Sequence, residues 1–254
     1  MSNHKTKSDL QVFSDGDSLA SAAAEAFAIA ASEAVASRGR FLVTLSGGST
    51  PQEMFALLAE PVFRTRIEWT AVHIYWGDER LVPPEDAGSN YYHAQRLLLT
   101  QVPIPASQIH RVRGELSAQD AVEDYNRQLK ALATGERVWP QFDLALMGMG
   151  ADGHTASLFP GSAAISEETR PVLAVTAEYA GRPAQRITMT PLVFNDARRV
   201  LFLVAGEGKA TALNAVLSGP HDVQKWPAQS IQPESKNLSW FVDRGAAKLL
   251  DPDQ

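Results

Sequence analysis

The 254-residue sequence contains no cysteine. This absence excludes disulfide-stapled scaffolds, cysteine-ligated zinc, iron–sulfur clusters and thiol catalysis. The sequence also lacks a block of basic residues and has a formal net charge of −6, which argues against nucleic acid or an anionic membrane as the main partner. No stretch approaches the roughly 20 apolar residues of a membrane span, and residues 1–9 lack the apolar run of a signal peptide. We therefore expect a cytoplasmic enzyme or ligand-binding protein.

No internal repeat, low-complexity tract or linker divides the sequence. We expect residues 1–14 to form a flexible leader and residues 15–254 to form a single domain. Within that domain, an alanine-rich stretch from Asp17 to Ser37 places serines and Glu25 on one helical face and alanines with Phe27 on the other. This pattern predicts an amphipathic core helix that ends at Gly39.

Five short, nearly continuous apolar runs predict strands that are buried on both faces of a parallel sheet. The runs are 41–45, 72–76, 142–147, 172–176 and 200–205. Helical patterns lie between them, at 89–99, 117–132 and 209–217. Strands that alternate with helices predict a layered α/β fold with a central, mostly parallel sheet flanked by helices.

The loop after the first run begins Ser-Gly-Gly-Ser-Thr-Pro at residue 46. Thr50 and Glu53 have the spacing of a capping box, and Pro51 stands at the first helical position. A strand therefore leads through a Gly-Gly turn to a helix N-terminus, where free N–H groups and the helix dipole favour an anion. The alternative is a tight turn without a ligand. The candidate phosphate-binding residues of this loop are Gly47, Gly48, Ser49 and Thr50.

The loops after later runs carry charge and a histidine. Asp78 and Arg80 follow the second run, and the Arg80 guanidinium suits a phosphate or carboxylate. Asp152 and His154 lie in a glycine-rich turn after the third run, a pairing typical of acid–base chemistry, although such groups also occur as solvated charges or loop braces. Lys209 follows the last run. Because parallel strands end at one edge of a sheet, we expect these loops to share a phosphorylated small molecule.

Other chemistries fit the sequence less well. Gly148, Gly150 and Gly153 match a dinucleotide-binding pattern, but Pro160 and Gly161 end any helix there and no acidic strand end follows. A nucleophile elbow is absent, and the six histidines are scattered singly, so we expect no metal site. If the reaction is a hydrolysis, we expect water, activated by His154, to be the nucleophile.

The loops also resemble the signature stretches of the 6-phosphogluconolactonase family. The matching stretches are Ser-Gly-Gly-Ser-Thr-Pro from residue 46, Gly-Asp-Glu-Arg-Leu-Val-Pro from 77, Ser-Asn-Tyr from 89 and Gly-Met-Gly-Ala-Asp-Gly-His-Thr-Ala-Ser-Leu-Phe-Pro-Gly from 148. Weaker matches begin at Arg186 and Gly206, and the similarity covers roughly residues 15–248.

This resemblance implies a fold of the sugar-phosphate isomerase/lactonase type and hydrolysis of 6-phospho-D-glucono-1,5-lactone to 6-phospho-D-gluconate in the oxidative pentose phosphate pathway. It implies no metal, nucleotide or other cofactor, and we infer no obligatory protein partner. His154 would be the catalytic histidine, and Arg80 and the Gly47–Thr50 loop would contact substrate, together with Arg186 and Lys209. Either Asp78 or Asp152 would orient His154 or the water.

Two alternatives remain. A glucosamine-6-phosphate isomerase/deaminase shares the fold, but its family carries Asn-Glu where this chain has Ser157-Leu158-Phe159. A non-catalytic sugar-phosphate sensor would need a DNA-binding helix-turn-helix, for which residues 1–14 are too short.

Overall fold

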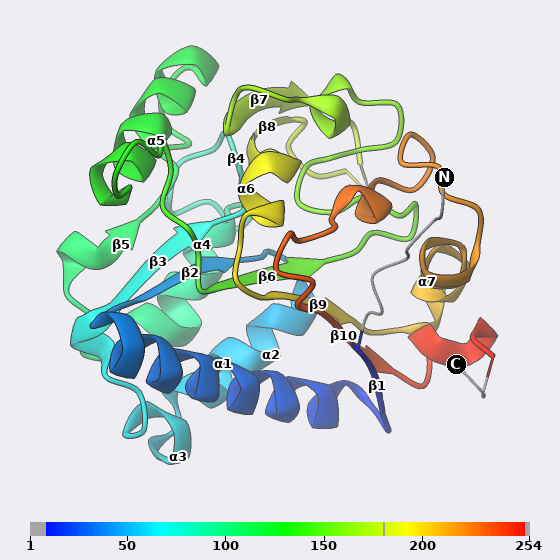
Figure 1. The fold of residues 1–254 in the computed structure, drawn as a ribbon, viewed down its shortest axis with the longest axis horizontal. Helices are drawn as coiled ribbons and strands as arrows, with labels where there is room; N and C mark the ends of the chain where they lie inside the picture. Colours follow the sequence, from blue (N-terminus) through cyan, green and yellow to red (C-terminus); the bar gives the residue numbers. More distant parts are fainter. Residues whose placement is uncertain (1–8, 180, 252–254) are drawn as a thin grey trace.

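Seven parallel strands form the central sheet of the computed structural model, which describes residues 9–179 and 181–251 (Figure 1). Their order across the sheet is β1 (Asp9–Phe13), β10 (Leu238–Asp243), β9 (Val200–Val204), β6 (Leu144–Gly148), β2 (Phe41–Leu45), β3 (Val72–Trp76) and β5 (Ile109–His110). Every neighbouring pair in this sheet is parallel. The predicted α/β fold with a mostly parallel central sheet is confirmed.

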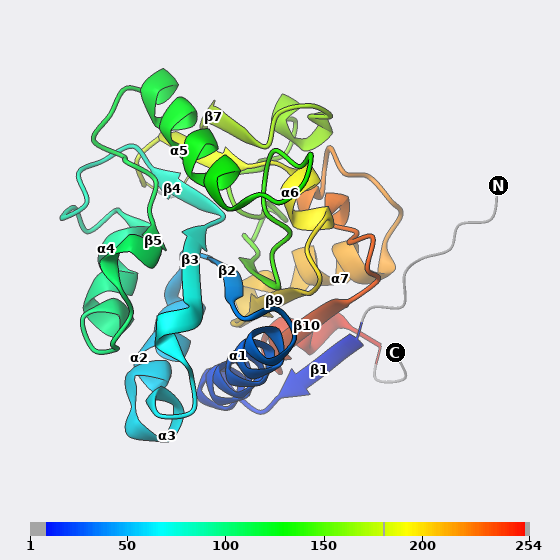
Figure 2. The ribbon, with the colours of Figure 1, turned by 60° about the vertical axis from the view of Figure 1, so that its left-hand side comes forward.

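Helices cover both faces of this sheet (Figure 2). One face carries α1 (Gly16–Arg38), α2 (Ser49–Ala59), α3 (Pro61–Arg64) and α4 (Asn90–Ala94); the other carries α5 (Ala118–Leu132), α6 (Pro191–Asn195) and α7 (Ala210–Ser218). Successive strand residues point to opposite faces, so in β2 Phe41 and Val43 belong to one buried cluster and Leu42 to the other. Burial on both faces is the reason that the central strands are continuously apolar.

A second, antiparallel sheet lies on the α5 and α6 side of the first (Figure 1). Its strand order is β4 (Asp78–Arg80), β8 (Gln185–Met189) and β7 (Val172–Thr176). The prediction that 172–176 belongs to the parallel sheet is therefore wrong. Within β7 only Val172 is fully buried, and Ala174 and Thr176 are exposed, because one face of this small sheet meets solvent.

The start of the described chain corrects the expected leader. Residues Asp9–Phe13 form β1, which pairs in parallel with β10 over the whole length of β1. Because β1 is an edge strand, its side chains are mostly exposed, and Val12 is 52% accessible. Such a strand has no continuous apolar run, which is why the sequence pattern missed it. Residues 1–8 of the expected leader lie outside the described residues.

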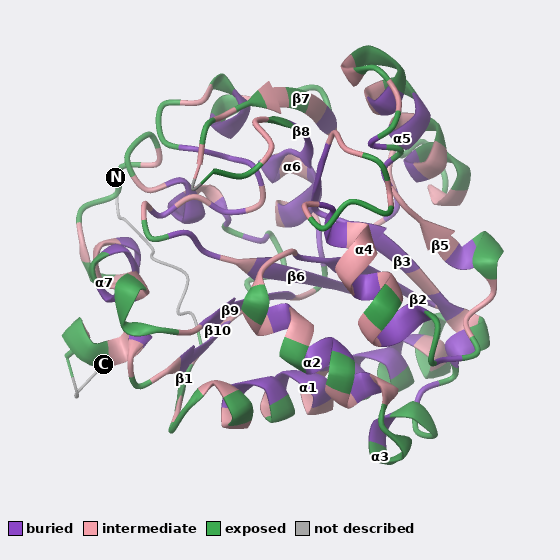
Figure 3. Cartoon of the chain, turned by 180° about the vertical axis from the view of Figure 1, so that it is seen from behind, coloured by how far each residue is buried: buried purple, intermediate pink, exposed green. Residues whose placement is uncertain are grey.

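The alanine-rich helix α1 is confirmed and packs closely on the sheet. Its buried face carries Phe27 and eight further residues, mostly alanine, and Gly39 ends the helix at φ 70° with its N–H donating to the Val35 carbonyl. By length and composition α1 would be able to cross a membrane, which corrects the expectation that no segment approaches this limit. Here one side of α1 is buried against the sheet and the other is exposed, as in a core helix (Figure 3).

Candidate active site

The candidate site lies where the sheet topology reverses. From β2 the chain moves outward to β3 and β5, whereas from β6 it moves the other way to β9. The loops after the adjacent strands β2 and β6 therefore diverge and leave a crevice at the carboxyl edge, the usual ligand site of open α/β sheets. A cleft with an empty volume of about 810 Å³, its open mouth included, occupies this position.

The cleft gathers nine of the ten residues that we expected at the site. They are Gly47, Gly48, Ser49, Thr50, Asp78, Arg80, His154, Arg186 and Lys209. The prediction that the Gly-Gly turn and His154 open into one cavity is therefore confirmed. Asp152, the tenth residue, does not line the cleft but contacts the far side of the His154 ring.

The Gly-Gly turn delivers the N-terminus of α2 to the cleft, although its cap differs from the expected one. Gly48 is the N-cap at φ 109°, a conformation that favours glycine, and no side chain caps the helix. The expected capping box of Thr50 and Glu53 is therefore wrong. Gly47 has a different role, since a Cβ there would lie 2.0 Å from the side-chain oxygen of Asn90. The free N–H groups of the first turn remain available for an anion.

His154 and Asp152 form a hydrogen-bonded pair in the loop after β6. Nδ1 of His154 lies 2.6 Å from Asp152 Oδ1, and the His154 side chain is 14% exposed. Burial raises the pKa of the Asp152 carboxyl, but the hydrogen bond and charge of His154 outweigh burial, so the net effect lowers this pKa. An ionised Asp152 accepts a hydrogen bond from Nδ1–H, and in a neutral imidazole this tautomer leaves Nε2 free to accept a proton.

Glycine is required for this pair to fit. A Cβ at Gly150 would lie 2.1 Å from His154 Nδ1 and 2.5 Å from Asp152 Oδ1. Gly153 has φ 79°, and a Cβ there would lie 2.7 Å from the Trp226 ring. These glycines therefore serve close packing within the loop, and the chain through 151–161 forms turns and no helix.

Asp78 lines the cleft but belongs to a different network. Its Oδ2 accepts the Ser157 hydroxyl proton at 2.7 Å, and its backbone carbonyl accepts from the Asn90 side chain at 2.9 Å. The carboxylate that contacts His154 is thus Asp152, and we take Asp152 as the orienting group. Asp78 instead ties the His154 loop to Asn90 at the start of α4.

Glu79, to which the sequence reasoning gave no role of its own, is a buried carboxylate next to the site. Its two oxygens accept four hydrogen bonds: from the N–H groups of Arg80, Asn90 and Tyr91, each at 2.7 Å, and from the Ser89 hydroxyl at 3.0 Å. Burial raises the pKa of Glu79, and these four donors oppose that effect. Glu79 thereby fixes Arg80 and the start of α4 in place.

Cationic side chains surround the remaining wall of the cleft. Arg186 is 2% exposed, and its Nε and Nη2 have no hydrogen-bond partner among the described residues; the same holds for Arg80 Nε. Burial lowers the pKa of Arg186 and also that of Lys209. Buried donors without a partner are costly, and the positive charge of both guanidinium groups, which line the cleft, favours an anion there.

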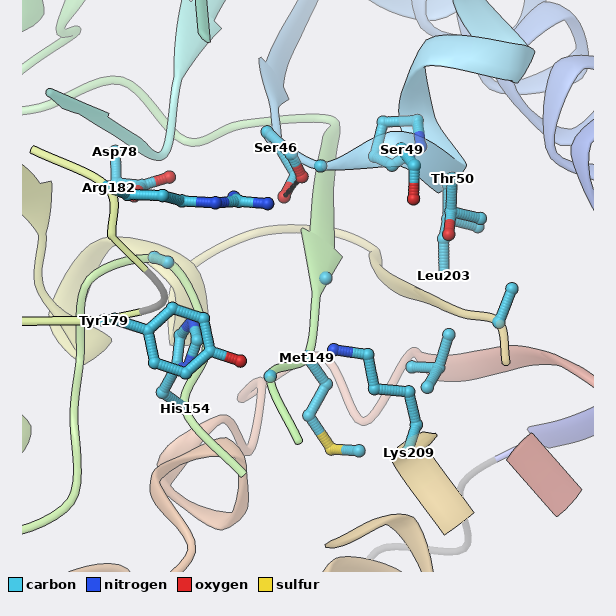
Figure 4. Close-up of a pocket in the computed structure, with 18 of the residues that line it drawn as sticks. Ser46, Ser49, Thr50, Asp78, Met149, His154, Tyr179, Arg182, Leu203 and Lys209 are labelled. Atoms are coloured by element: carbon cyan, nitrogen blue, oxygen red, sulfur yellow. Dashed lines mark hydrogen bonds between the residues drawn. The ribbon is translucent and has the colours of Figure 1, made fainter. Parts of the chain in front are cut away.

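The structure adds cleft residues that the sequence reasoning missed. Ser46, Met149, Tyr179 and Arg182 line the cleft, and Figure 4 shows the Arg182 guanidinium directed toward Ser46 and the Lys209 ammonium toward the middle of the space. Tyr179 and Arg182 lie between β7 and β8, a connection that carries no motif. Only an antiparallel pairing of β7 with β8 would have placed them near the site, and that pairing was not predicted. Within residues 9–179 and 181–251, no group of three His, Cys, Asp or Glu side chains is arranged to hold a metal ion.

An open α/β sheet with a His–Asp pair and unpaired cations at its switch point is typical of enzymes that perform acid–base chemistry on small anionic substrates. Residues 14–240 match the family model described as glucosamine-6-phosphate isomerases/6-phosphogluconolactonase. The chain therefore belongs to this family.

Individual relatives agree with this placement. The chain is 39% identical to the 6-phosphogluconolactonase of Aggregatibacter actinomycetemcomitans over 208 residues, which is 82% of this chain and 87% of that protein. It also resembles the solved structure of 6-phosphogluconolactonase from Trypanosoma brucei, with TM-score 0.85, 27% identity, and coverage of 96% of this chain and 99% of that one. A monomeric glucosamine-6-phosphate deaminase shares the fold, with TM-score 0.80, 18% identity, and coverage of 95% and 99%.

Proposed function

We propose that this protein hydrolyses 6-phospho-D-glucono-1,5-lactone to 6-phospho-D-gluconate, a step of the oxidative pentose phosphate pathway. The observation that carries the proposal is the pairing of His154 Nδ1 with Asp152 at 2.6 Å, beside a cleft that also holds the α2 N-terminus and four cationic side chains. The family membership and the 6-phosphogluconolactonase relatives support the same reaction.

In the first step His154 acts as a general base. Asp152 holds the proton on Nδ1, so Nε2 accepts a proton from a water molecule as that water attacks C1 of the lactone. The ester carbon becomes tetrahedral and its carbonyl oxygen becomes negative. We assign this charge to the Arg186 guanidinium, which lines the cleft.

In the second step the bond between C1 and the ring oxygen breaks. The protonated His154 returns its proton to the departing ring oxygen, which becomes the C5 hydroxyl. The new carboxylic acid then releases its remaining proton to solvent, which gives the carboxylate of 6-phosphogluconate. Atoms and charge balance with one water consumed and with His154 restored to its neutral form.

The phosphate of the substrate supplies binding energy far from the reacting carbon. We assign it to the first turn of α2, where Ser49 and Thr50 present their N–H groups, with Lys209 on the facing wall. Met149, also in the cleft lining, lies beside Lys209 (Figure 4). No cofactor, nucleic acid or protein partner takes part in the proposed reaction, and the cytoplasmic location stays a prediction.

The deaminase alternative lacks a side chain that it would need. Its family carries a glutamate in the stretch where this chain has Ser157, Leu158 and Phe159, all of which are buried. The Ser157 hydroxyl is engaged by Asp78, and Asp78 is the one carboxylate residue among the described residues that line the cleft. A carboxylate for opening an amino-sugar ring is therefore not supplied at that position.

The test is a hydrolysis assay with freshly prepared 6-phosphogluconolactone, corrected for spontaneous hydrolysis. We expect a rate well above the uncatalysed rate, a much weaker effect on glucono-1,5-lactone without the phosphate, and no release of ammonia from glucosamine 6-phosphate. Ammonia release without lactone hydrolysis would show that the protein is a deaminase. Binding of the sugar phosphate without turnover of either substrate would show that the protein is a non-catalytic sensor.

A further inference from the structure

Two aromatic rings from different elements contact the His154 ring. Phe159, in the same loop, stacks on it with ring centroids 4.4 Å apart and an interplanar angle of 27°. Tyr179, which follows β7, meets it edge-to-face with centroids 4.6 Å apart and an angle of 76°. Figure 4 shows the Tyr179 ring immediately beside His154, with the tyrosine hydroxyl directed toward the open part of the cleft.

The two aromatic rings restrict different motions of the imidazole ring. The bond from Asp152 fixes one edge of the ring, and the Phe159 stack fixes its plane, with Phe159 itself held by Arg186, whose Cζ lies 5.3 Å from the Phe159 centroid. These contacts leave the imidazole able to swing within its own plane about the Asp152 hydrogen bond. Tyr179 is steeply inclined to the imidazole, and its ring centroid lies only 5.8 Å from that of Phe159, so Tyr179 stands beside the imidazole at its edge and opposes this swing.

The backbone around Tyr179 supports such a role. Its carbonyl accepts the Arg182 N–H at 3.0 Å, and an isolated bridge joins the same two residues. The side chain is half-buried and belongs to the cleft lining, so it is placed by the β7–β8 connection and not by the protein core. A ring held in this way can restrict the motion of the His154 ring without being essential to the fold.

We propose that Tyr179 is a positioning residue for His154, and that its aromatic ring, not its hydroxyl, keeps Nε2 directed at the substrate carbon. This inference rests on the proposed hydrolysis. A base that swings away from its reaction geometry loses rate even when the substrate binds normally, because catalysis depends on near-attack alignment. Aromatic contacts of this kind contribute beyond the area they bury.

The experiment compares Tyr179→Ala and Tyr179→Phe in the lactone assay, with Tyr92→Ala as the matched control. Tyr92 also meets a histidine, His93, edge-to-face at 5.4 Å, but away from the cleft lining. For Tyr179→Ala we expect kcat to fall about tenfold, with KM changed less than about threefold. We expect Tyr179→Phe to restore kcat to within about twofold of the wild type, and Tyr92→Ala to match the wild type equally closely.

Several outcomes would overturn the proposal. An unchanged kcat in Tyr179→Ala would remove the positioning role, and a raised KM with normal kcat would make Tyr179 a binding residue. A Tyr179→Phe variant as slow as Tyr179→Ala would transfer the role to the hydroxyl. If Tyr179→Ala fails to fold by circular dichroism, Tyr179→Leu takes its place under the same criteria.

An NMR measurement separates this inference from the proposed function. The ring protons of His154 feel the ring current of Tyr179, so their resonances should move in Tyr179→Ala and stay in place in Tyr92→Ala. Wild-type protein without lactonase activity would defeat the proposed function, while the resonances would still report whether Tyr179 holds the imidazole. Unmoved His154 resonances in Tyr179→Ala would overturn the contact itself.

Discussion

Two histidine sites in this molecule differ in what their rings touch. His154 stands beside the cleft, with Nδ1 on the Asp152 carboxylate and Phe159 against its face. His110, at the β5 edge of the main sheet, shares a hydrogen bond with His73, whose Nδ1 lies 3.1 Å from His110 Nε2. One imidazole is paired with an anion, and the other with a second imidazole.

The difference decides what each ring can do. A carboxylate partner fixes the tautomer of His154 and stabilises the proton that it takes up during reaction. For His110, burial lowers the pKa to about 4, and His73 adds to the effect. The nearby Arg40 likewise disfavours a charged His73, whose pKa is lowered mainly by burial. The first site suits proton transfer, and the second is held neutral as part of the packing.

The largest expected effect comes from His154→Ala, which removes the base. We expect kcat to fall by about 10²–10⁴, with little change in KM, because the phosphate contacts remain. Steady-state kinetics with 6-phosphogluconolactone measures this, and His110→Gln provides the contrasting variant, with kcat within about twofold of the wild type. Turnover that survives in His154→Ala would remove His154 from the mechanism.

The Asp152→Asn variant tests whether the carboxylate partner, and not the histidine alone, makes the His154 site suited to proton transfer. An asparagine amide that donates to Nδ1 would favour the tautomer with its proton on Nε2, where the base must be free. We expect kcat to fall by about 10², with an unchanged fold by circular dichroism. Wild-type kcat in this variant would show that the Asp152 pairing is structural.

Arg80→Ala separates substrate binding from proton transfer within the cleft. The Arg80 guanidinium lines the cleft, and its positive charge would attract a substrate anion. We expect KM to rise about tenfold, equivalent to about 1.4 kcal/mol, with a smaller change in kcat. The melting temperature is the control, since Arg80 Nη1 also donates to the Gly88 carbonyl. An unchanged KM would reject the binding role of Arg80.

The contrast between the two histidines also marks what the sequence allows one to predict. The loop after β6 follows a buried strand with its glycines, Asp152 and His154 close together in the chain, so both its position and its chemistry were predictable. His73 and His110 lie 37 residues apart and meet only because β3 pairs with β5, a two-residue strand. A strand that short leaves no periodic signal.

The same reasoning explains the other errors. Tyr179 and Arg182 reach the cleft through the antiparallel sheet, and Asp78 lies buried near the site without touching His154. Spacing in the sequence predicts which strand end a residue follows, but not which of two carboxylates turns toward a ring. In this cleft that depends on Gly150, whose missing side chain makes room for the pair of Asp152 and His154.

The smallest expected effect concerns stability at the second histidine site. Because the pKa of His110 in the folded protein is about 4, below the ordinary value of 6.5, the unfolded chain takes up the proton first as the pH falls. The contribution of neutral His110 to the free energy of unfolding is therefore fully present above about pH 6.5 and is lost between about pH 6.5 and 4. After allowance for solvent screening of this half-buried ring, we expect a loss of roughly 1–2 kcal/mol.

Urea unfolding at pH 7 and pH 4.5 measures that loss. His110→Gln cannot titrate, so it should lose less stability on acidification than the wild type, while exposed His221→Gln should lose as much as the wild type. The difference between variants cancels the contribution of the carboxylates that all three proteins share. An equal loss in His110→Gln and wild type would mean that the pair accepts a proton as easily folded as unfolded. The two histidine sites would then differ in position alone, and partner chemistry would no longer account for their separate roles.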